Sequence, residues 1–185
     1  MHKLESQIFK SKLQTTSEEF KKNKESMIGM LEEIDILLDE AEAGGGPDHQ
    51  KRLAARGKLP VRESIFNFLD PDSPFLEISG LAGYKSDYPV GGGAVAGIGV
   101  CSGIECIIFA NDPTVLAGAM HYYSVKKWMR SMAIARDCRI PFIQFVESAG
   151  GDLRPRGAMS AGAMGHFAES GRQFYEITEL SKLNI

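Results

Sequence analysis

The chain has 185 residues, of which 43% are hydrophobic and 24% are charged, so it can bury one ordinary core and is too apolar to be disordered over most of its length. Its formal net charge of -3 gives no general attraction to nucleic acid or to an anionic membrane, so we expect neither as a partner. A phosphate group would have to bind a local basic cluster.

The first residues, Met1 to Glu5, lack the apolar core of a signal peptide, and no run approaches the roughly 20 apolar residues that span a bilayer. We therefore expect a cytoplasmic protein, or a protein of the mitochondrial matrix if the source is eukaryotic. The three cysteines have no Cys-x-x-Cys spacing, and the histidines have no metal-ligand spacing. This pattern predicts buried thiols, no disulfide framework and no metal site.

Apolar residues recur on one helical face between Ser17 and Ala43, and Ser17 can cap the helix while Gly44-Gly45-Gly46 ends it. We interpret residues 1–46 as an N-terminal helical arm with a solvated Lys/Glu face. Residues 47–185 then form the main domain.

Two short helices are predicted next, from Pro47 to a stop at Gly57 and from Arg62 to about Leu69, before Asp70-Pro71. They concentrate basic side chains within a few turns of chain, at Lys51, Arg52, Arg56, Lys58 and Arg62. This cluster could hold a phosphate, or it could instead be a solvated helix end or pair with carboxylates.

The rest of the chain alternates strands and helices, which favours a parallel α/β core with a β-hairpin layer beside it. The second hairpin strand is apolar on both faces, as in a covered sheet. The predicted strands are 75–82, 94–101, 104–110 and 142–146, and the predicted helices are 123–138 and 165–183, separated by a Gly, Ala, Arg and Pro-rich loop.

Two glycine-centred segments, Gly91 to Gly118 and Phe145 to Gly151, place bare backbone amides at strand ends. Such amides can donate to a developing oxyanion. Ser148 does not indicate a hydrolase, because Val146 occupies the first glycine position of a Gly-x-Ser-x-Gly elbow. Gly97-Ile98-Gly99 does not indicate a dinucleotide site, because Ser102 stands at the third glycine and a strand follows.

Several short strings occur in one order along the chain. The strings are Ala54-Ala-Arg-Gly-Lys-Leu59, Arg62-Glu-Ser-Ile65, Leu69-Asp-Pro71, Gly91-Gly-Gly93, Ala96-Gly-Ile-Gly99, Ala110-Asn-Asp112, Thr114-Val115, Lys126-Lys127 and Glu147-Ser-Ala-Gly-Gly151. As an ordered set they resemble the carboxyltransferase (β) subunit of biotin-dependent acyl-CoA carboxylases, and among these the methylcrotonyl-CoA and propionyl-CoA carboxylase type. The resemblance runs from about Gly44 to Ile185 and covers only the first part of such a subunit.

The resemblance implies an α/β crotonase-like (ClpP/crotonase) fold, here its N-terminal portion preceded by the long helical arm. It implies transfer of a carboxyl group from carboxybiotin, carried on a separate protein, to an acyl-CoA whose enolate is held by backbone N–H groups. Biotin is the implied cofactor, and acyl-CoA, a biotin carboxyl carrier or biotin carboxylase subunit, and further copies of the chain in face-to-face dimers or a hexamer are the implied partners.

Site residues carry over by position. The amides of Val115 and Gly118 are the implied oxyanion donors, although Ala117 stands where the family usually has a second glycine. The implied CoA-binding and substrate-binding residues are Arg56, Lys58, Arg62, Tyr122, Ser148, Ala149, Gly150 and Gly151. Glu147, Ala149 and Asp152 depart from the usual string, which narrows that turn and adds negative charge near a site for anions.

The second donor of the family belongs to a Gly-Gly pair after the next strand, and that strand would begin just past Ile185. We therefore expect the chain to be a fragment that is inactive alone. The open alternatives are a non-catalytic or split-half CoA-binding or assembly piece, and a biotin-dependent decarboxylase or crotonase-like hydratase on the same fold.

Overall fold

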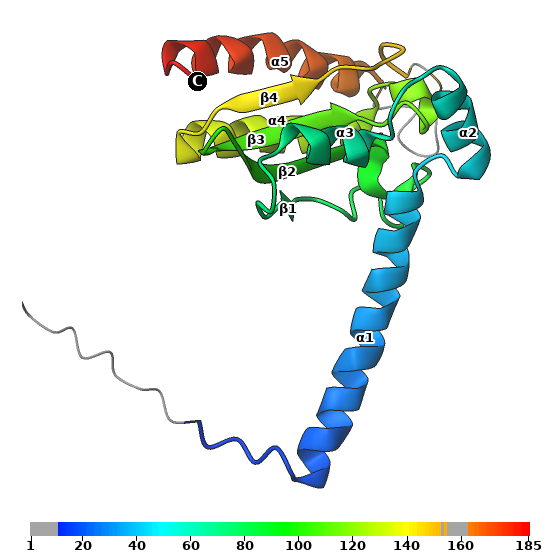
Figure 1. The fold of residues 1–185 in the computed structure, drawn as a ribbon, viewed down its shortest axis with the longest axis vertical. Helices are drawn as coiled ribbons and strands as arrows, with labels where there is room; N and C mark the ends of the chain where they lie inside the picture. Colours follow the sequence, from blue (N-terminus) through cyan, green and yellow to red (C-terminus); the bar gives the residue numbers. More distant parts are fainter. Residues whose placement is uncertain (1–10, 153, 155–162) are drawn as a thin grey trace, which may run out of the picture. The chain divides into compact units, whose positions relative to one another are not determined.

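The computed structural model describes residues 11–152, 154 and 163–185 (Figure 1). The chain divides into two compact units, Met1–Ile36 and Leu37–Ile185. Helix α1 runs from Glu18 to Ala43. The amide of Phe20 donates to Ser17 Oγ at 3.1 Å, so Ser17 caps the helix as the sequence predicts.

A four-stranded sheet forms the centre of the second unit, in the order β1-β2-β3-β4 (Figure 1). The strands are β1 (Leu76–Glu77), β2 (Ala94–Cys101), β3 (Ile104–Asn111) and β4 (Phe142–Phe145). Neighbours in the sheet are antiparallel from β1 to β3, whereas β3 and β4 are parallel. The predicted hairpin is confirmed, but the idea of a separate hairpin layer was wrong, because the free edge of β3 takes β4 into the same sheet.

The hairpin turn is fixed by a carboxylate from another segment. Ser102 and Gly103 both have positive φ angles, of 53° and 75°, as a tight two-residue turn requires. Their amides donate to the two carboxylate oxygens of Asp70, each at 2.7 Å. Asp70 therefore does more than end the preceding helix.

The extended segment predicted over 75–82 is mostly not a strand. Only β1 pairs with β2, followed by a single bond from the amide of Ile78 to the Ala96 carbonyl oxygen at 2.8 Å. Ser79 then adopts a φ of 54°, and this left-handed residue turns the chain away from the sheet.

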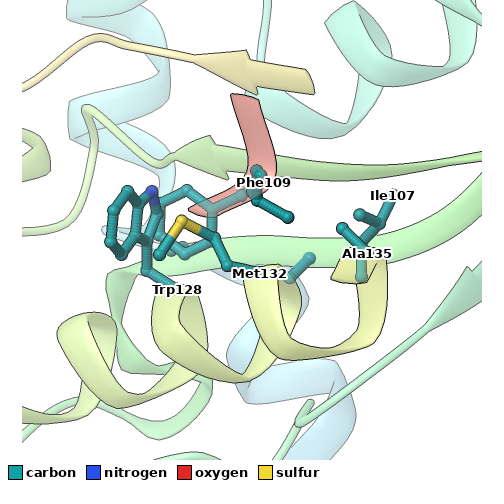
Figure 2. Close-up of a cluster of buried hydrophobic side chains, with 8 residues drawn as sticks. Ile107, Phe109, Trp128, Met132 and Ala135 are labelled. Atoms are coloured by element: carbon teal, nitrogen blue, oxygen red, sulfur yellow. The ribbon is translucent and has the colours of Figure 1, made fainter. Parts of the chain in front are cut away.

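Two helices cover opposite faces of the sheet, and β3 is buried between them. Helix α4 (Tyr122–Cys138) packs Trp128, Met132 and Ala135 on Ile107 and Phe109 (Figure 2). Helix α3 (Val61–Phe68) covers the other face with a cluster that comprises Ile65, Leu69, Val95, Cys106, Ile108 and Ala110. Successive β3 residues thus face α4 and α3 in turn, which explains why the strand is apolar throughout.

Two helices complete the described fold. Helix α2 (Pro47–Ala55) begins after Gly46, and helix α5 (Ala163–Lys182) packs against α4. An ion pair of 2.8 Å between Arg136 and the buried Glu176 joins α4 to α5. The helices expected from the sequence are therefore confirmed, with ends that differ by one or two residues.

The cysteines have three different environments. Cys106 is buried, Cys101 is half-buried and Cys138 is exposed, so the prediction of buried thiols was wrong for Cys138 at the end of α4. Within the described ranges, no helix is long and apolar enough to cross a membrane. The same residues contain no group of three or more His, Cys, Asp or Glu side chains placed to hold a metal ion.

The turn after β3 lies directly against the segment after β4. The amide of Met120 donates to the Gly150 carbonyl oxygen at 2.8 Å, and the Asp152 amide returns a bond to Met120 at 2.8 Å. Gly118, with a φ of 69°, stands where a Cβ would overlap the carbonyl oxygen of Glu147. Only a glycine lets the two backbones approach this closely.

A buried lysine supports the glycine turn that precedes β2. Lys127 on α4 is only 2% exposed, and its Nζ donates to the carbonyl oxygens of Gly91 at 3.1 Å and Ala94 at 2.7 Å. Burial lowers the pKa of Lys127 to about 8, with a nearby Glu77 acting in the opposite direction. The ammonium therefore holds this turn at the cost of its own desolvation.

Lys127 makes the stability of the fold depend on pH. Between about pH 8 and 10.5 the unfolded chain holds the Lys127 proton while the folded chain has lost it, so the free energy of unfolding rises with pH through this window. We expect this rise to be about 3 kcal/mol larger in the wild type than in Lys127→Met. Urea titrations at the two ends of the window measure it. Lys126→Met, on the exposed side of the same helix, should behave as the wild type; equal rises in all three proteins would refute the assignment.

The crowding at Gly118 can be tested by comparison with Gly103, which also has a positive φ but has no atom close to where a Cβ would be added. We expect Gly118→Ala to lower the free energy of unfolding by about 2–4 kcal/mol, because the added Cβ meets the Glu147 carbonyl. Gly103→Ala should cost only about 1 kcal/mol, since its positive φ is strained but no atom lies near the new Cβ. Urea denaturation of both variants decides the matter, and similar losses would contradict the crowding argument.

Candidate functional site

A cavity of about 460 Å³ lies between helix α2 and the turn that follows β3. Side chains from α2 form one wall, and the backbone of the turn forms the opposite wall. The cavity is lined by Gly44, Gly45, His49, Arg52, Leu53, Arg56, Pro89, Pro113, Thr114, Val115, Leu116, Ala117 and Glu147.

The α2 wall is basic. His49, Arg52 and Arg56 are three and four residues apart, so they share one face along the helix and its C-terminal end. Within the part of the chain that the structure describes, neither arginine forms an ion pair, while His49 Nδ1 lies 2.8 Å from the Gly45 carbonyl oxygen. Two guanidinium groups are therefore available to an anion in the cavity.

The start of α2 is anchored to the loop after β3. The amide of Gly45 donates to Thr114 Oγ1 at 3.0 Å, and Thr114 Oγ1 donates to Asp112 Oδ1 at 2.5 Å. A side chain on Gly45 would overlap the Thr114 carbonyl oxygen. Asp112 and Thr114 are buried, so this contact fixes the basic wall relative to the turn.

The backbone amides that lack an acceptor in this turn are not the ones expected from the sequence. The amide of Val115 donates to the Asp112 carbonyl oxygen at 3.1 Å, and that of Gly118 donates to the Val115 carbonyl oxygen at 2.9 Å. The amides of Leu116 and Ala117 have no acceptor among the described residues, and both residues line the cavity. Of this turn, the geometry therefore favours Leu116 and Ala117 as donors to an oxyanion.

The backbone conformation of these two residues is unusual. Leu116 and Ala117 have φ angles of 50° and 54°, in the left-handed region where non-glycine residues carry strain. Such strain persists where the surroundings hold it, and it concentrates at functional sites. The positive φ was not evident from the sequence because neither residue is glycine.

Asn111 at the end of β3 holds this turn. Its side chain is buried, and Nδ2 donates to the Gly118 carbonyl oxygen at 3.1 Å. The sequence marked Asn111 only as a strand end. Asn111 can support the turn only because Gly118, seven positions later in the chain, folds back to it, and the sequence does not show this.

The structure brings only some of the expected phosphate-binding residues to this cavity. Arg56 lines it, and Lys58 lies next to it in an ion pair with Glu147. Arg62 instead forms a two-pronged pair with Glu77, with Nη2 to Oε1 at 3.1 Å. Burial by itself would lower the pKa of Arg62, but the hydrogen bond to Glu77 and the negative charges of Glu77, Glu42 and Asp112 together raise it.

Two lining residues are not among those that the family resemblance implied for the site, although Arg52 belongs to the basic cluster noted from the sequence. His49 and Arg52 both face the cavity from α2. Their spacing with Arg56, at steps of three and four residues, was a usable signal, because such residues lie on one face of a helix.

The remaining expected site residues do not line the cavity. Tyr122 packs edge-on against Tyr123, with ring centroids 5.1 Å apart, and beneath Lys126. In the segment after β4, the Ala149 amide donates to the Ala117 carbonyl oxygen at 3.0 Å. The Gly150 amide donates to Ser148 Oγ at 3.1 Å, and Gly151 pairs with Met120.

Comparisons with known proteins place this arrangement in one family. The carboxyl transferase domain family matches residues 52–185. The probable biotin-dependent acyl-coenzyme A carboxylase beta2 subunit of Mycobacterium tuberculosis is 43% identical over 160 residues, which are 86% of this chain and 29% of that protein. The probable mitochondrial methylcrotonoyl-CoA carboxylase beta chain of Drosophila melanogaster is 36% identical over 188 residues, which cover 100% of this chain and 32% of that protein.

Solved structures of a carboxylase beta subunit and of a transcarboxylase are similar to this chain. The beta subunit of geranyl-CoA carboxylase from Pseudomonas aeruginosa superposes with a TM-score of 0.73 at 33% identity, over 91% of this chain and 31% of that one. The transcarboxylase 12S structure with methylmalonyl-coenzyme A bound gives a TM-score of 0.65 at 26% identity, over 76% of this chain and 28% of that one.

The family resemblance and the crotonase-like α/β fold expected from the sequence are thus confirmed. The chain spans about a third of the length of the relatives it matches. It belongs to the carboxyl transferase domain family, by sequence over residues 52–185 and by fold.

Proposed function

We propose that this chain is part of the carboxyltransferase component of a biotin-dependent acyl-CoA carboxylase. One observation carries the proposal: among the described residues, a single cavity has two arginines without acidic partners on one wall and two bare backbone amides on the other. A CoA thioester has the matching groups, with phosphates at one end and a carbonyl oxygen at the other.

The residues of the cavity would act by binding and by electrostatic stabilisation. Arg52 and Arg56, with Lys58 beside them, would hold the CoA phosphates through charge-assisted hydrogen bonds. The amides of Leu116 and Ala117 would donate to the thioester oxygen as it becomes an enolate. In comparable sites the loss of one such donor costs about 3–4 kcal/mol. This chemistry requires no side-chain nucleophile.

Carboxybiotin, on a separate carrier, would supply the carboxyl group, and the biotin anion left after its release would take up the substrate proton. Relatives of this chain are named as beta subunits of biotin-dependent carboxylases, which supports a biotin carboxyl carrier or biotin carboxylase subunit as partner. Transcarboxylase 12S is a hexamer assembly, which supports a homo-oligomer here. The relatives' names also support a branched or short acyl group, such as methylcrotonyl, geranyl or propionyl.

In the proposed domain organisation, residues 1–46 form a helical arm and residues 47–185 form the first part of the carboxyltransferase domain. The partner donor amide would lie in the part of the longer relatives that this chain does not span. We propose the cytoplasm as compartment, or the mitochondrial matrix in a eukaryote, since several relatives are named as mitochondrial.

A second candidate is a CoA-binding or assembly piece without activity of its own. The arginines that line the cavity can bind phosphates whether or not a reaction follows, which favours it. Exchange of label between a malonyl-type CoA and free biotin separates the two functions. Exchange by the chain alone supports the catalytic function, and CoA binding without exchange supports the second.

The arginine wall gives a direct test of CoA binding. We expect Arg52→Ala and Arg56→Ala each to weaken binding of coenzyme A by about tenfold or more, because each removes a charge-assisted hydrogen bond to a phosphate. Isothermal titration calorimetry measures the affinity. Lys51→Ala, on the same helix but outside the cavity, changes the net charge equally and should leave the affinity within about twofold. Unchanged affinity in both arginine variants would eliminate this binding mode.

A further inference from the structure

Glu147, in the segment after β4, has a fixed backbone position. Its carbonyl oxygen lies against Gly118, at a position where no side chain could fit. Two residues later, the amide of Ala149 donates to the Ala117 carbonyl oxygen at 3.0 Å. The backbone of Glu147 is therefore held beside the turn that carries the bare amides. Its side chain lines the cavity.

The Glu147 carboxylate forms an ion pair with Lys58, which follows α2. The two side chains are 42% and 48% exposed, so the pair is open to solvent. Exposed pairs of this kind shift an equilibrium by at most about fivefold, so a competing anion can displace the carboxylate.

Glu147 is also the acidic side chain in an otherwise basic cavity. Arg52 and Arg56 line the same space, and no other carboxylate is among its described lining residues. Any anion that binds these arginines approaches Glu147 as well. Lys58 is then the cation for which the carboxylate and the ligand compete.

We propose that Glu147 controls the affinity and selectivity of the cavity for phosphate-bearing ligands by holding Lys58 until such a ligand displaces it. This inference rests on the proposed CoA-binding function. A ligand whose phosphate reaches Lys58 takes over the ammonium group and leaves Glu147 to solvent. A ligand that binds only the arginines leaves the Lys58–Glu147 pair intact. Such a ligand is repelled by the Glu147 carboxylate, whose charge Lys58 neutralises only in part.

The test is the affinity of the full chain for coenzyme A and for adenosine 3′,5′-bisphosphate, measured by calorimetry. Glu147→Gln should tighten coenzyme A binding by about two- to fivefold, because Lys58 no longer has to leave a carboxylate. In the Lys58→Ala background the same substitution should give less than about a twofold change. Comparison of the two ligands shows which part of coenzyme A reaches Lys58.

Glu63→Gln is the matched control, since it removes the same charge from the exposed surface of α3 outside the cavity, and it should leave both affinities unchanged. Glu147→Asp, which keeps the charge and shortens the side chain, should fall between the wild type and Glu147→Gln, and it replaces Glu147→Gln if that variant fails to fold.

Each remaining outcome decides against the inference. Unchanged or weaker binding in Glu147→Gln, with Arg56→Ala still weakening coenzyme A, overturns the inference alone. Equal tightening with and without Lys58 shows simple repulsion by Glu147 and also overturns it. Absence of coenzyme A binding by the wild type overturns the proposed function and, with it, this inference.

Discussion

The close contact between the backbone after β3 and the backbone after β4 determines the shape of the candidate site. Gly118 touches the Glu147 carbonyl oxygen, and Met120 exchanges hydrogen bonds with Gly150 and Asp152. In the turn that this contact holds, the amides of Leu116 and Ala117 have no acceptor among the described residues. The same contact fixes the backbone of Glu147, whose side chain lines the cavity.

Buried polar groups transmit this geometry to the rest of the domain. Asn111 joins the turn to the end of β3, and Asp112 with Thr114 joins the same loop to Gly45 at the start of α2. Buried polar groups that find their partners make an arrangement specific, because any alternative leaves them unpaired in a low dielectric. The basic face of α2 and the turn with the bare amides thus line one cavity and are joined to each other through Thr114.

Strand and helix positions could largely be predicted from the sequence, since each depends on local periodicity and on Gly or Pro at the ends. The hairpin at Ser102-Gly103 and the apolar strand β3 are examples. The pairing of β4 with β3 in one mixed sheet was not predictable in this way, because periodicity does not say which strand edges meet. The segment 75–82 was overpredicted because Ser79 adopts a left-handed conformation that its residue type does not signal.

For the candidate site, the order of residues along the chain was enough to identify the family and the chemical groups present: a basic cluster after the helical arm, glycines at strand ends and no nucleophile in a hydrolase context. Which of these groups meet depends on the folded chain. Folding directs Arg62 to Glu77, brings Arg52 and Arg56 to the cavity, and uses the amides of Val115 and Gly118 inside the turn. The reason is physical: a charge or an amide takes whichever partner lies within about 3 Å, and for residues far apart in sequence that distance is set by the packing of the sheet and helices.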